Sequence, residues 1–383
     1  MNDLSPLLPA GIYDLLPPAA EREASLVSGL LATLSAHGYQ RVEPPLVEFE
    51  ETLLSGAGAA MAASTFRMMD PLSHRMIAVR SDMTPQIARI AATRLGAAAR
   101  PLRLSYAGEV LRTKASEIRP ERHFGQVGAE LIGAPGAAAD VEVIALAAEA
   151  LFAVGVKDLS VDLTLPALVP SLVKAYAIPE EKAFLLRAAL DRKDAAAVRE
   201  AAGKRQGDFA RLLAAAGPAS AAERELEALD LPPAARAEVG RLAAVRAGLE
   251  ASIPELKATI DPVENRGFEY HTGVSFTFFA AGGGGRGELG RGGRYEAGEK
   301  EKAEPATGFT LYADRVLPFL PEDKARPRLL LPFGTQRPRA EALRAAGWIT
   351  LAALEPVEDW RAEARRLRCR YFLEGGLPVE TDG

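Results

Sequence analysis

The sequence has a single cysteine, Cys369, among its 383 residues. One thiol excludes an internal disulfide framework and a cysteine-based metal site. No apolar run approaches the roughly 18 residues that a membrane-spanning helix needs, so we expect no membrane segment. The first residues also lack a basic start followed by an apolar core. We therefore expect no signal peptide and a cytoplasmic protein.

Aromatic residues are few, at 6%, and neither sign of charge dominates, because the formal net charge is −5. This mildly acidic balance argues against a general nucleic-acid binder, although a basic patch can be hidden within an acidic total. The chain is 48% hydrophobic and 25% charged, which is typical of a globular protein. Its length predicts two or three folded units.

Two segments in the first third of the chain alternate in the manner of β-strands. Residues 104–111 and 124–132 both place apolar side chains at every second position. The segment 113–122 between them is charged, contains Pro120 and is too long for a tight turn. The pattern therefore predicts an antiparallel pair of strands joined by a long charged loop.

On this pairing Arg112, Gln126 and Glu130 project from the same side of the sheet. A guanidinium can bind a carboxylate and a glutamate can bind an ammonium group, so the three side chains together could hold a zwitterion. The alternative is that they form only the solvated face of an antiparallel sheet.

Proline marks the boundaries of the elements that precede this pair. A helical pattern runs over residues 19–36, and Pro44-Pro45 then interrupt a strand. Residues 65–80 predict a hairpin. A further helix opens at Thr84, which is placed to cap it, with Pro85 at the first helical position.

Residues 164–252 differ in composition from the rest of the chain. They are rich in alanine, periodic in leucine and dense in arginine and glutamate, which favours helices on propensity alone. We expect an inserted subdomain of about four helices here. Residues 327–383 predict two short strands and one or two helices.

Several of these segments resemble motifs of the histidyl-tRNA synthetases and their relatives. The arginine at 112, the long loop and Phe-x-Gln-x-Gly-x-Glu at 124–130 resemble motif 2. The strand broken by Pro44-Pro45 resembles motif 1, which builds the dimer interface in that family. Asn-Arg-Gly-Phe-Glu-Tyr-His at 265–271 is similar to the histidine-specific signature Arg-Gly-Leu-Asp-Tyr-Tyr, with His271 in place of the second tyrosine.

Residues 307–317 resemble motif 3, Gly-Phe-x-x-Gly-x-Glu-Arg-Leu. Arg315 matches the arginine of that motif, whereas Tyr312 and Asp314 stand where the motif has Gly and Glu. In the synthetases motif 2 begins Arg-Tyr-Glu, and its glutamate helps to position ATP; this chain has Lys114 there. Reversing a charge in a preorganised site changes its electrostatic interaction with the ligand by several kcal/mol. Lys114 and Arg315 would then mark a degenerate nucleotide site.

The resemblance covers residues 6–320 and implies an α+β fold, a class II aminoacyl-tRNA synthetase-like antiparallel sheet flanked by helices. The implied core is discontinuous, over residues 1–163 and 253–322. A helical insertion would occupy residues 164–252, and residues 323–383 would form a small C-terminal α/β segment.

The resemblance also implies a histidine-binding pocket made of Asp82, Thr84, Arg112, Gln126, Glu130, Arg266, Tyr270 and Tyr295. In the related motifs the acid and the threonine that match Asp82 and Thr84 contact the histidine ammonium. We predict no catalytic residue, no metal ligand and no cofactor.

Only about sixty residues follow motif 3, fewer than a full anticodon-binding domain usually has, so we expect no tRNA to bind. A chain that keeps the histidine-binding residues but lacks amino-acid activation and an anticodon-binding domain resembles the regulatory subunits of ATP phosphoribosyltransferase.

That family implies no independent catalysis. It implies a short-form catalytic partner, L-histidine as effector in the first step of histidine biosynthesis, and self-dimers within a hetero-octamer. The alternatives are a histidine–tRNA ligase, a synthetase-like amino-acid ligase, or a histidine sensor without a partner.

Overall fold

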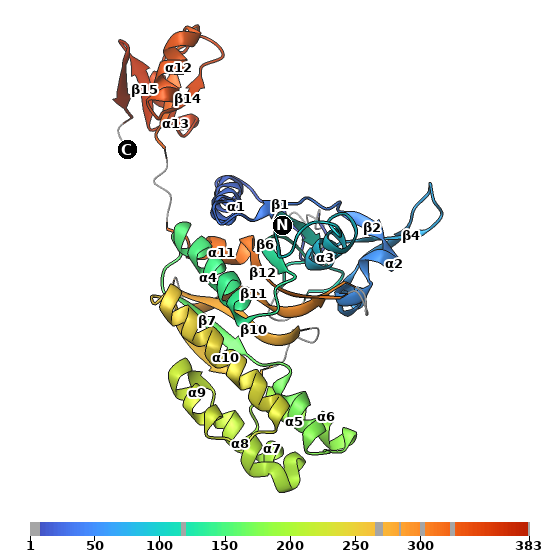
Figure 1. The fold of residues 1–383 in the computed structure, drawn as a ribbon. Coiled ribbons are helices and arrows are strands. Elements are labelled where there is room, and N and C mark those ends of the chain that lie inside the picture. The colour runs from blue at the N-terminus through green and yellow to red at the C-terminus, as the bar shows by residue number, and fades with distance from the viewer. Residues whose placement is uncertain are drawn as a thin grey trace, which may run out of the picture. The chain divides into compact units, whose positions relative to one another are not determined.

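The computed structural model of the chain describes residues 8–115, 120–264, 271–282, 285–298, 303–321 and 326–381. Its contacts divide the chain into two compact units, Met1–Leu320 and Pro321–Gly383. Within these ranges the two units share no sheet (Figure 1). Each also has its own hydrophobic clusters. The first unit contains every candidate site residue.

The first unit is built on one large sheet. Among the residues described it has nine strands, in the spatial order β1 (Gln40–Arg41), β5 (Leu102–Leu111), β6 (His123–Ile132), β12 (Glu304–Tyr312), β11 (Gly285–Ala297), β10 (His271–Gly282), β7 (Leu159–Thr164), β9 (Lys257–Asp261) and β8 (Gly217–Pro218). Strands β5 and β6 form the predicted antiparallel pair. Strand β6 also pairs with β12, so the middle of the sheet joins segments that lie far apart in the sequence.

Helices cover both faces of this sheet at β6. Helices α1 (Ala19–Ala36) and α4 (Ala137–Ala153) pack on one face, and α3 (Thr84–Thr93) packs on the other. Because the side chains of a strand alternate, Val127 and Leu131 of β6 are buried in one cluster with α1 and α4. On the opposite face, Tyr106 of β5 is buried in a second cluster with Ile87 of α3. The structure confirms the predicted bounds of α1, whose leucines at positions 26, 30 and 34 are buried.

A second, three-stranded sheet in the same unit follows the order β2 (Val47–Phe49), β4 (Met76–Val79) and β3 (Arg67–Met69). Strands β3 and β4 form the predicted hairpin. The two prolines separate β2 from β1, as the sequence predicted. Two short helical segments, α2 (Glu50–Leu53) and η1 (Gly56–Ser64), lead from β2 to β3.

The predicted insertion folds into helices beside β7 (Figure 1). The described helices are α5 (Leu168–Ala175), α6 (Glu180–Asp191), α7 (Ala195–Ala202), η2 (Gly203–Arg205), α8 (Gln206–Ala214), α9 (Ala219–Glu227) and α10 (Pro233–Ser252). There are more of them than the four predicted, because Pro179, Gly203, Pro218 and Pro232 break the helical pattern more often than leucine periodicity reveals. The first unit ends with α11 (Ala313–Val316) and η4 (Leu317–Phe319).

The second unit has four short strands in the order β14 (Ile349–Ala352), β13 (Arg328–Leu331), β15 (Tyr371–Glu374) and β16 (Leu377–Glu380), with helices α12 (Arg337–Ala345) and α13 (Trp360–Arg366). The sequence predicted only two strands. The extra ones were missed because each has four residues, too few to show a clear alternation.

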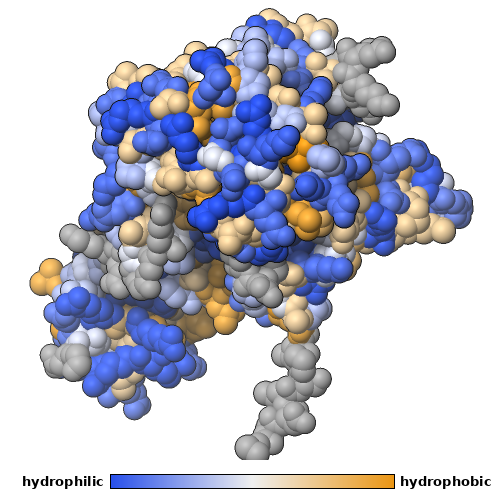
Figure 2. Space-filling view, turned by 90° about the horizontal axis from the view of Figure 1, so that it is seen from below, coloured by the Kyte–Doolittle hydropathy of each residue, from blue (hydrophilic) through white to orange (hydrophobic). Residues whose placement is uncertain are grey.

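Hydrophilic side chains predominate on the face of the molecule in Figure 2, with apolar ones in small groups between them. In the part of the chain that the structure describes, no helix is both long and apolar enough to cross a membrane.

One buried ion pair connects three parts of the first unit. Arg294 of β11 and Asp140 of α4 are 5% and 1% exposed, and their side chains approach to 2.8 Å (Nη2–Oδ1) and 3.2 Å (Nε–Oδ2). Arg241 of α10 lies 3.8 Å from the same carboxylate. Burial raises the pKa of Asp140 above its usual value, although Arg294 opposes that rise. One carboxyl group therefore ties the insertion to the sheet.

We expect the substitution Asp140→Ala to lower the free energy of unfolding by about 3 kcal/mol, because it leaves the Arg294 guanidinium buried without its partner. Urea unfolding followed by circular dichroism measures the change. The matched control is Glu250→Ala, which removes an exposed ion pair with Arg246 on α10 and should cost less than about 0.5 kcal/mol. Equal losses in the two variants would contradict the assigned role.

Candidate functional site

The candidate site lies on the face of the sheet that packs against α3. Strand β6 presents Gln126 and Glu130 on this face, and the register places Gly308 of β12 opposite Glu130. A Cβ atom on residue 308 would lie 1.7 Å from the Oε2 atom of Glu130. Only glycine at position 308 therefore lets the Glu130 side chain lie across β12.

Glu130 is the centre of the site. It is 1% exposed, and its carboxyl group accepts hydrogen bonds from Thr84 Oγ1 at 3.0 Å, Tyr295 OH at 3.0 Å and Tyr106 OH at 3.4 Å. Within the residues described, no lysine, arginine or histidine forms an ion pair with it. A buried carboxyl group that has only hydroxyl donors can bind a cation from a ligand.

Burial raises the pKa of Glu130 to about 8. The hydroxyl groups of Tyr295 and Thr84 favour the ionised form and oppose this rise, whereas the charge of Asp82 adds to it. Near neutral pH the group therefore holds a proton in the absence of a cation. A bound cation would favour the carboxylate and displace that proton.

A second network lies beside Glu130 and contains Asp82, Gln126 and Arg112. The amide of Gln126 donates to Asp82 Oδ2 at 3.0 Å and accepts from the backbone N–H of Met83 at 3.1 Å. Arg112 Nη2 lies 4.0 Å from Asp82 Oδ2, and Arg112 Nε donates to the Ser81 carbonyl at 3.2 Å. These contacts hold the Asp82 carboxylate and the Arg112 guanidinium close to each other on the Gln126 side of the site.

Thr84 does not cap α3, contrary to the sequence prediction. The helix starts at Thr84 itself, with Met83 at the cap position and Pro85 second. The Thr84 hydroxyl donates to Glu130, while Asp82 Oδ1 accepts the Thr84 N–H at 3.0 Å. The reason is that the buried Glu130 carboxyl group has few other hydrogen-bond donors, whereas an N–H group at the start of the helix can donate to Asp82 instead.

The structure thus brings together six of the predicted pocket residues: Asp82, Thr84, Arg112, Gln126, Glu130 and Tyr295. The remaining two, Arg266 and Tyr270, lie outside the described residues. Lys114 is exposed, and the half-buried Arg315 lies on α11. Neither takes part in the two networks above, and their assignment to a degenerate nucleotide site stays a prediction.

Sequence reasoning missed Tyr106 and Thr310. Tyr106 bonds to Glu130 and lies 2.8 Å from the Thr310 hydroxyl, so the pair supports the carboxyl group from β5 and β12. The strand alternation of residues 104–111 could have placed Tyr106 on the site face, but it does not distinguish a binding residue from a core residue.

A small cavity of about 20 Å³ lies beside Glu130, with room for about one water molecule. It is lined by Thr84, Glu130, His271, Arg291, Gly292, Gly293, Tyr295, Gly308, Phe309 and Thr310. Within the ranges that the structure describes, no three His, Cys, Asp or Glu side chains are grouped to hold a metal ion.

Comparison with known proteins agrees with this fold. The family model "Histidyl-tRNA synthetase" matches residues 11–316. A solved structure from Bacillus halodurans, titled ATP phosphoribosyltransferase regulatory subunit/histidyl-tRNA synthetase, superimposes with a TM-score of 0.79 at 26% identity, covering 94% of this chain and 97% of that one. The fold and the site face therefore define a class II synthetase-like protein of the histidyl-tRNA synthetase type.

Two curated relatives narrow the assignment. The ATP phosphoribosyltransferase regulatory subunit of Paramagnetospirillum magneticum is 56% identical over 376 residues, or 98% of each chain. The protein of the same name from Rhodospirillum centenum is 54% identical over 370 residues, 97% of this chain and 95% of its own. The chain belongs to the family of ATP phosphoribosyltransferase regulatory subunits.

The raised pKa of Glu130 predicts a particular dependence of stability on pH. The folded protein holds this proton more tightly than the unfolded chain, so the contribution of Glu130 to stability is present at low pH and is lost as pH rises from about 4.5 to about 8. Glu130→Gln cannot ionise. Between pH 5 and pH 9 its free energy of unfolding should therefore gain a few kcal/mol relative to the unsubstituted protein.

Urea unfolding at pH 5, 7 and 9 measures this difference. Glu142→Gln is the control, because the hydrogen bond from Arg103 lowers the pKa of Glu142, and so the effect of that substitution should be constant over this range. Parallel pH profiles for Glu130→Gln and the unsubstituted protein would show that Glu130 is ionised in the folded state throughout.

Proposed function

We propose that this chain is a non-catalytic regulatory subunit that activates a short-form ATP phosphoribosyltransferase catalytic subunit and makes it sensitive to histidine. Near-full-length relatives at 54% and 56% identity are named regulatory subunits of that enzyme. The observation that carries the histidine part is the buried carboxyl group of Glu130, which has hydroxyl partners but no cation among the described residues.

Free histidine has the charges that the two networks complement. A cationic nitrogen of the ligand can bind Glu130, with Asp82 adding negative charge nearby. The ligand carboxylate can bind the Arg112 guanidinium, whose Nε–H is already fixed by the Ser81 carbonyl. Thr84, Gln126 and Tyr295 hold these charged groups in place, and the family resemblance adds Arg266 and Tyr270 to the set.

Histidine can regulate a partner only if it binds the active and the inhibited assembly with different affinity. A coupling of about 1–3 kcal/mol between the two sites is typical. Helix α3 is the element through which such a difference can be transmitted, because its first residue, Thr84, bonds Glu130 and its cap residue, Met83, bonds Gln126. Histidine binding would change the geometry of these hydrogen bonds and thereby the position of the helix.

The alternative function is a histidine–tRNA ligase or a related amino-acid ligase. The match of residues 11–316 to the histidyl-tRNA synthetase family model favours this alternative. Against it stands Lys114, which replaces the acid of motif 2 and so reverses the charge at the position that helps to place ATP.

We expect this protein to raise phosphoribosyl-ATP formation by a short-form catalytic subunit of the same organism, and histidine to reverse that rise. In this assay Glu130→Ala should shift the inhibitory histidine concentration upward by about tenfold or more, because one charged hydrogen bond is lost. Glu142→Ala, outside the site, is the control. No effect on the partner, together with histidine-dependent pyrophosphate exchange by this chain alone, would establish the ligase instead.

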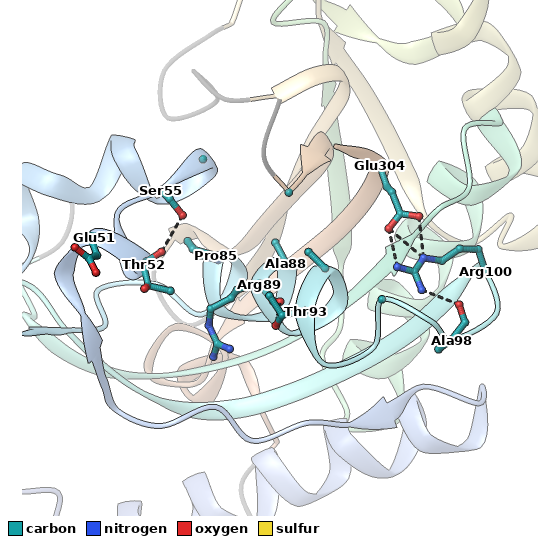
Figure 3. A pocket seen from close by; sticks show the side chains of 14 residues that line it. Glu51, Thr52, Ser55, Pro85, Ala88, Arg89, Thr93, Ala98, Arg100 and Glu304 are labelled. Atoms are coloured by element: carbon teal, nitrogen blue, oxygen red, sulfur yellow. Dashed lines mark hydrogen bonds and ion pairs between the residues drawn. The ribbon is translucent and has the colours of Figure 1, made fainter. Parts of the chain in front are cut away.

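The proposal includes a self-dimer as the unit that assembles with the catalytic subunit into a hetero-octamer. The outer face of α3 is open and lines a groove of about 760 Å³, the α3 groove (Figure 3). Small residues of the helix, Pro85, Ala88 and Ala92, form part of its wall. A second hollow of about 610 Å³ adjoins it, because Thr52 and Arg89 line both.

The charges around the α3 groove are already paired. Arg89 forms an ion pair with Glu48. Arg100 forms one with Glu304 (Figure 3). A second copy of the chain can therefore cover this face without burying an unpaired charge. The exposed Leu46, between Pro45 and Val47 of the second hollow, adds apolar surface for such a contact.

Ala92→Arg should convert the dimer to a monomer, since it places a long charged side chain on the floor of the α3 groove. Sedimentation velocity over a series of concentrations measures the mass, and the variant should stay monomeric up to protein concentrations about tenfold or more above those at which the unsubstituted chain dimerises. Ala244→Arg on the exposed side of α10 is the matched control. An unchanged dimer in Ala92→Arg would place the interface elsewhere.

A further inference from the structure

We infer that Tyr312 determines what the site admits: its ring closes the site next to Gln126, so that a free amino acid fits and a nucleotide, or an amino acid extended by a nucleotide through its carboxylate, does not. The identity of the amino acid rests on the proposed function, whereas the exclusion of nucleotides can be tested without it.

The first observation is the order of side chains along β12. Antiparallel register places its residues 306, 308, 310 and 312 on the site face, opposite positions 132, 130, 128 and 126 of β6. The first three are Ala, Gly and Thr, and the fourth is Tyr312. The strand therefore leaves space beside Glu130, where side chains are small, and fills the space beside Gln126.

The second observation is the packing around that ring. Tyr312 is 7% exposed and belongs to the buried cluster on the site side of the sheet. Its ring meets the ring of Phe124 edge to face, with centroids 5.9 Å apart. The guanidinium carbon of Arg112 lies 5.1 Å from the Phe124 centroid. Two rings and a guanidinium thus form a wall where the site approaches Arg112.

This wall limits the length of the ligand. A free carboxylate needs only to reach the Arg112 guanidinium. A carboxylate that is joined to a phosphate and a base must place a further planar group where the two rings lie. Protein interiors are packed as densely as organic crystals, so a second planar group cannot enter without displacing Tyr312.

Once the Tyr312 ring is removed, the side chains of Phe124 and Arg112 suit a planar anion. Removing the Tyr312 ring opens space beside the Phe124 ring, against which a base can pack, and Arg112 offers a charged donor for a phosphate. The related motif 3 has glycine at position 312, where no side chain would cover that ring. Tyr312, rather than a missing phosphate-binding group, would then occupy the space that a base needs.

The test measures ATP binding by isothermal titration calorimetry for the unsubstituted chain and for Tyr312→Ala, Tyr312→Leu and Tyr312→Phe. We expect ATP to bind at least about tenfold more tightly to the alanine variant, with a smaller gain for leucine and none for phenylalanine, which keeps the ring. Phe278→Leu, in the core cluster on the opposite side of the sheet, is the control and should gain nothing.

Folded alanine and leucine variants that bind ATP no better than the unsubstituted chain would overturn the inference, and so would a phenylalanine variant that gains as much as alanine. If Tyr312→Ala does not fold by circular dichroism, Tyr312→Leu decides. Titration of the same proteins with histidine separates the two proposals. Histidine binding without a gain for ATP rejects only the role of Tyr312, whereas a gain for ATP without histidine binding rejects only the histidine pocket.

Discussion

The structure depends on the burial of one carboxyl group, that of Glu130. A buried carboxyl group is stable only if its oxygens are hydrogen-bonded, and here the donors come from three different elements: Thr84 of α3, Tyr106 of β5 and Tyr295 of β11. Gly308 of β12 makes the room. The requirements of this one side chain therefore constrain the placement of α3 on the sheet and the register of its central strands.

The same sheet connects the site with the insertion. On β11, the consecutive residues Arg294 and Tyr295 point to opposite faces: Tyr295 bonds Glu130, and Arg294 forms the buried ion pair with Asp140. Arg241 of α10 approaches that aspartate from the insertion, so a chain of contacts connects α10, α4 and β11 with the carboxyl group in the site. The two buried acids, Glu130 and Asp140, are thus both bonded to side chains of β11.

The fold is that of a family that includes enzymes, so the fold does not decide the function. What differs is local: a lysine at 114, and a buried tyrosine at 312 that packs on Phe124. The charged groups that suit an amino acid lie together, while the adjacent space is filled by rings. On the function proposed above, such a face would bind one ligand without joining it to a second one.

Local pattern by itself determined α1, the β5–β6 pair, the β3–β4 hairpin and the break at the two prolines, because each depends on residues close together in the chain. Alternation along β6 also placed Gln126 and Glu130 on one face. Only the tertiary structure decided the bond from Thr84 to Glu130, the role of Tyr106 and the position of Tyr312 against Phe124. These depend on the pairing of β6 with β12 and on the burial of charge, and both arise from contacts between residues far apart in the sequence.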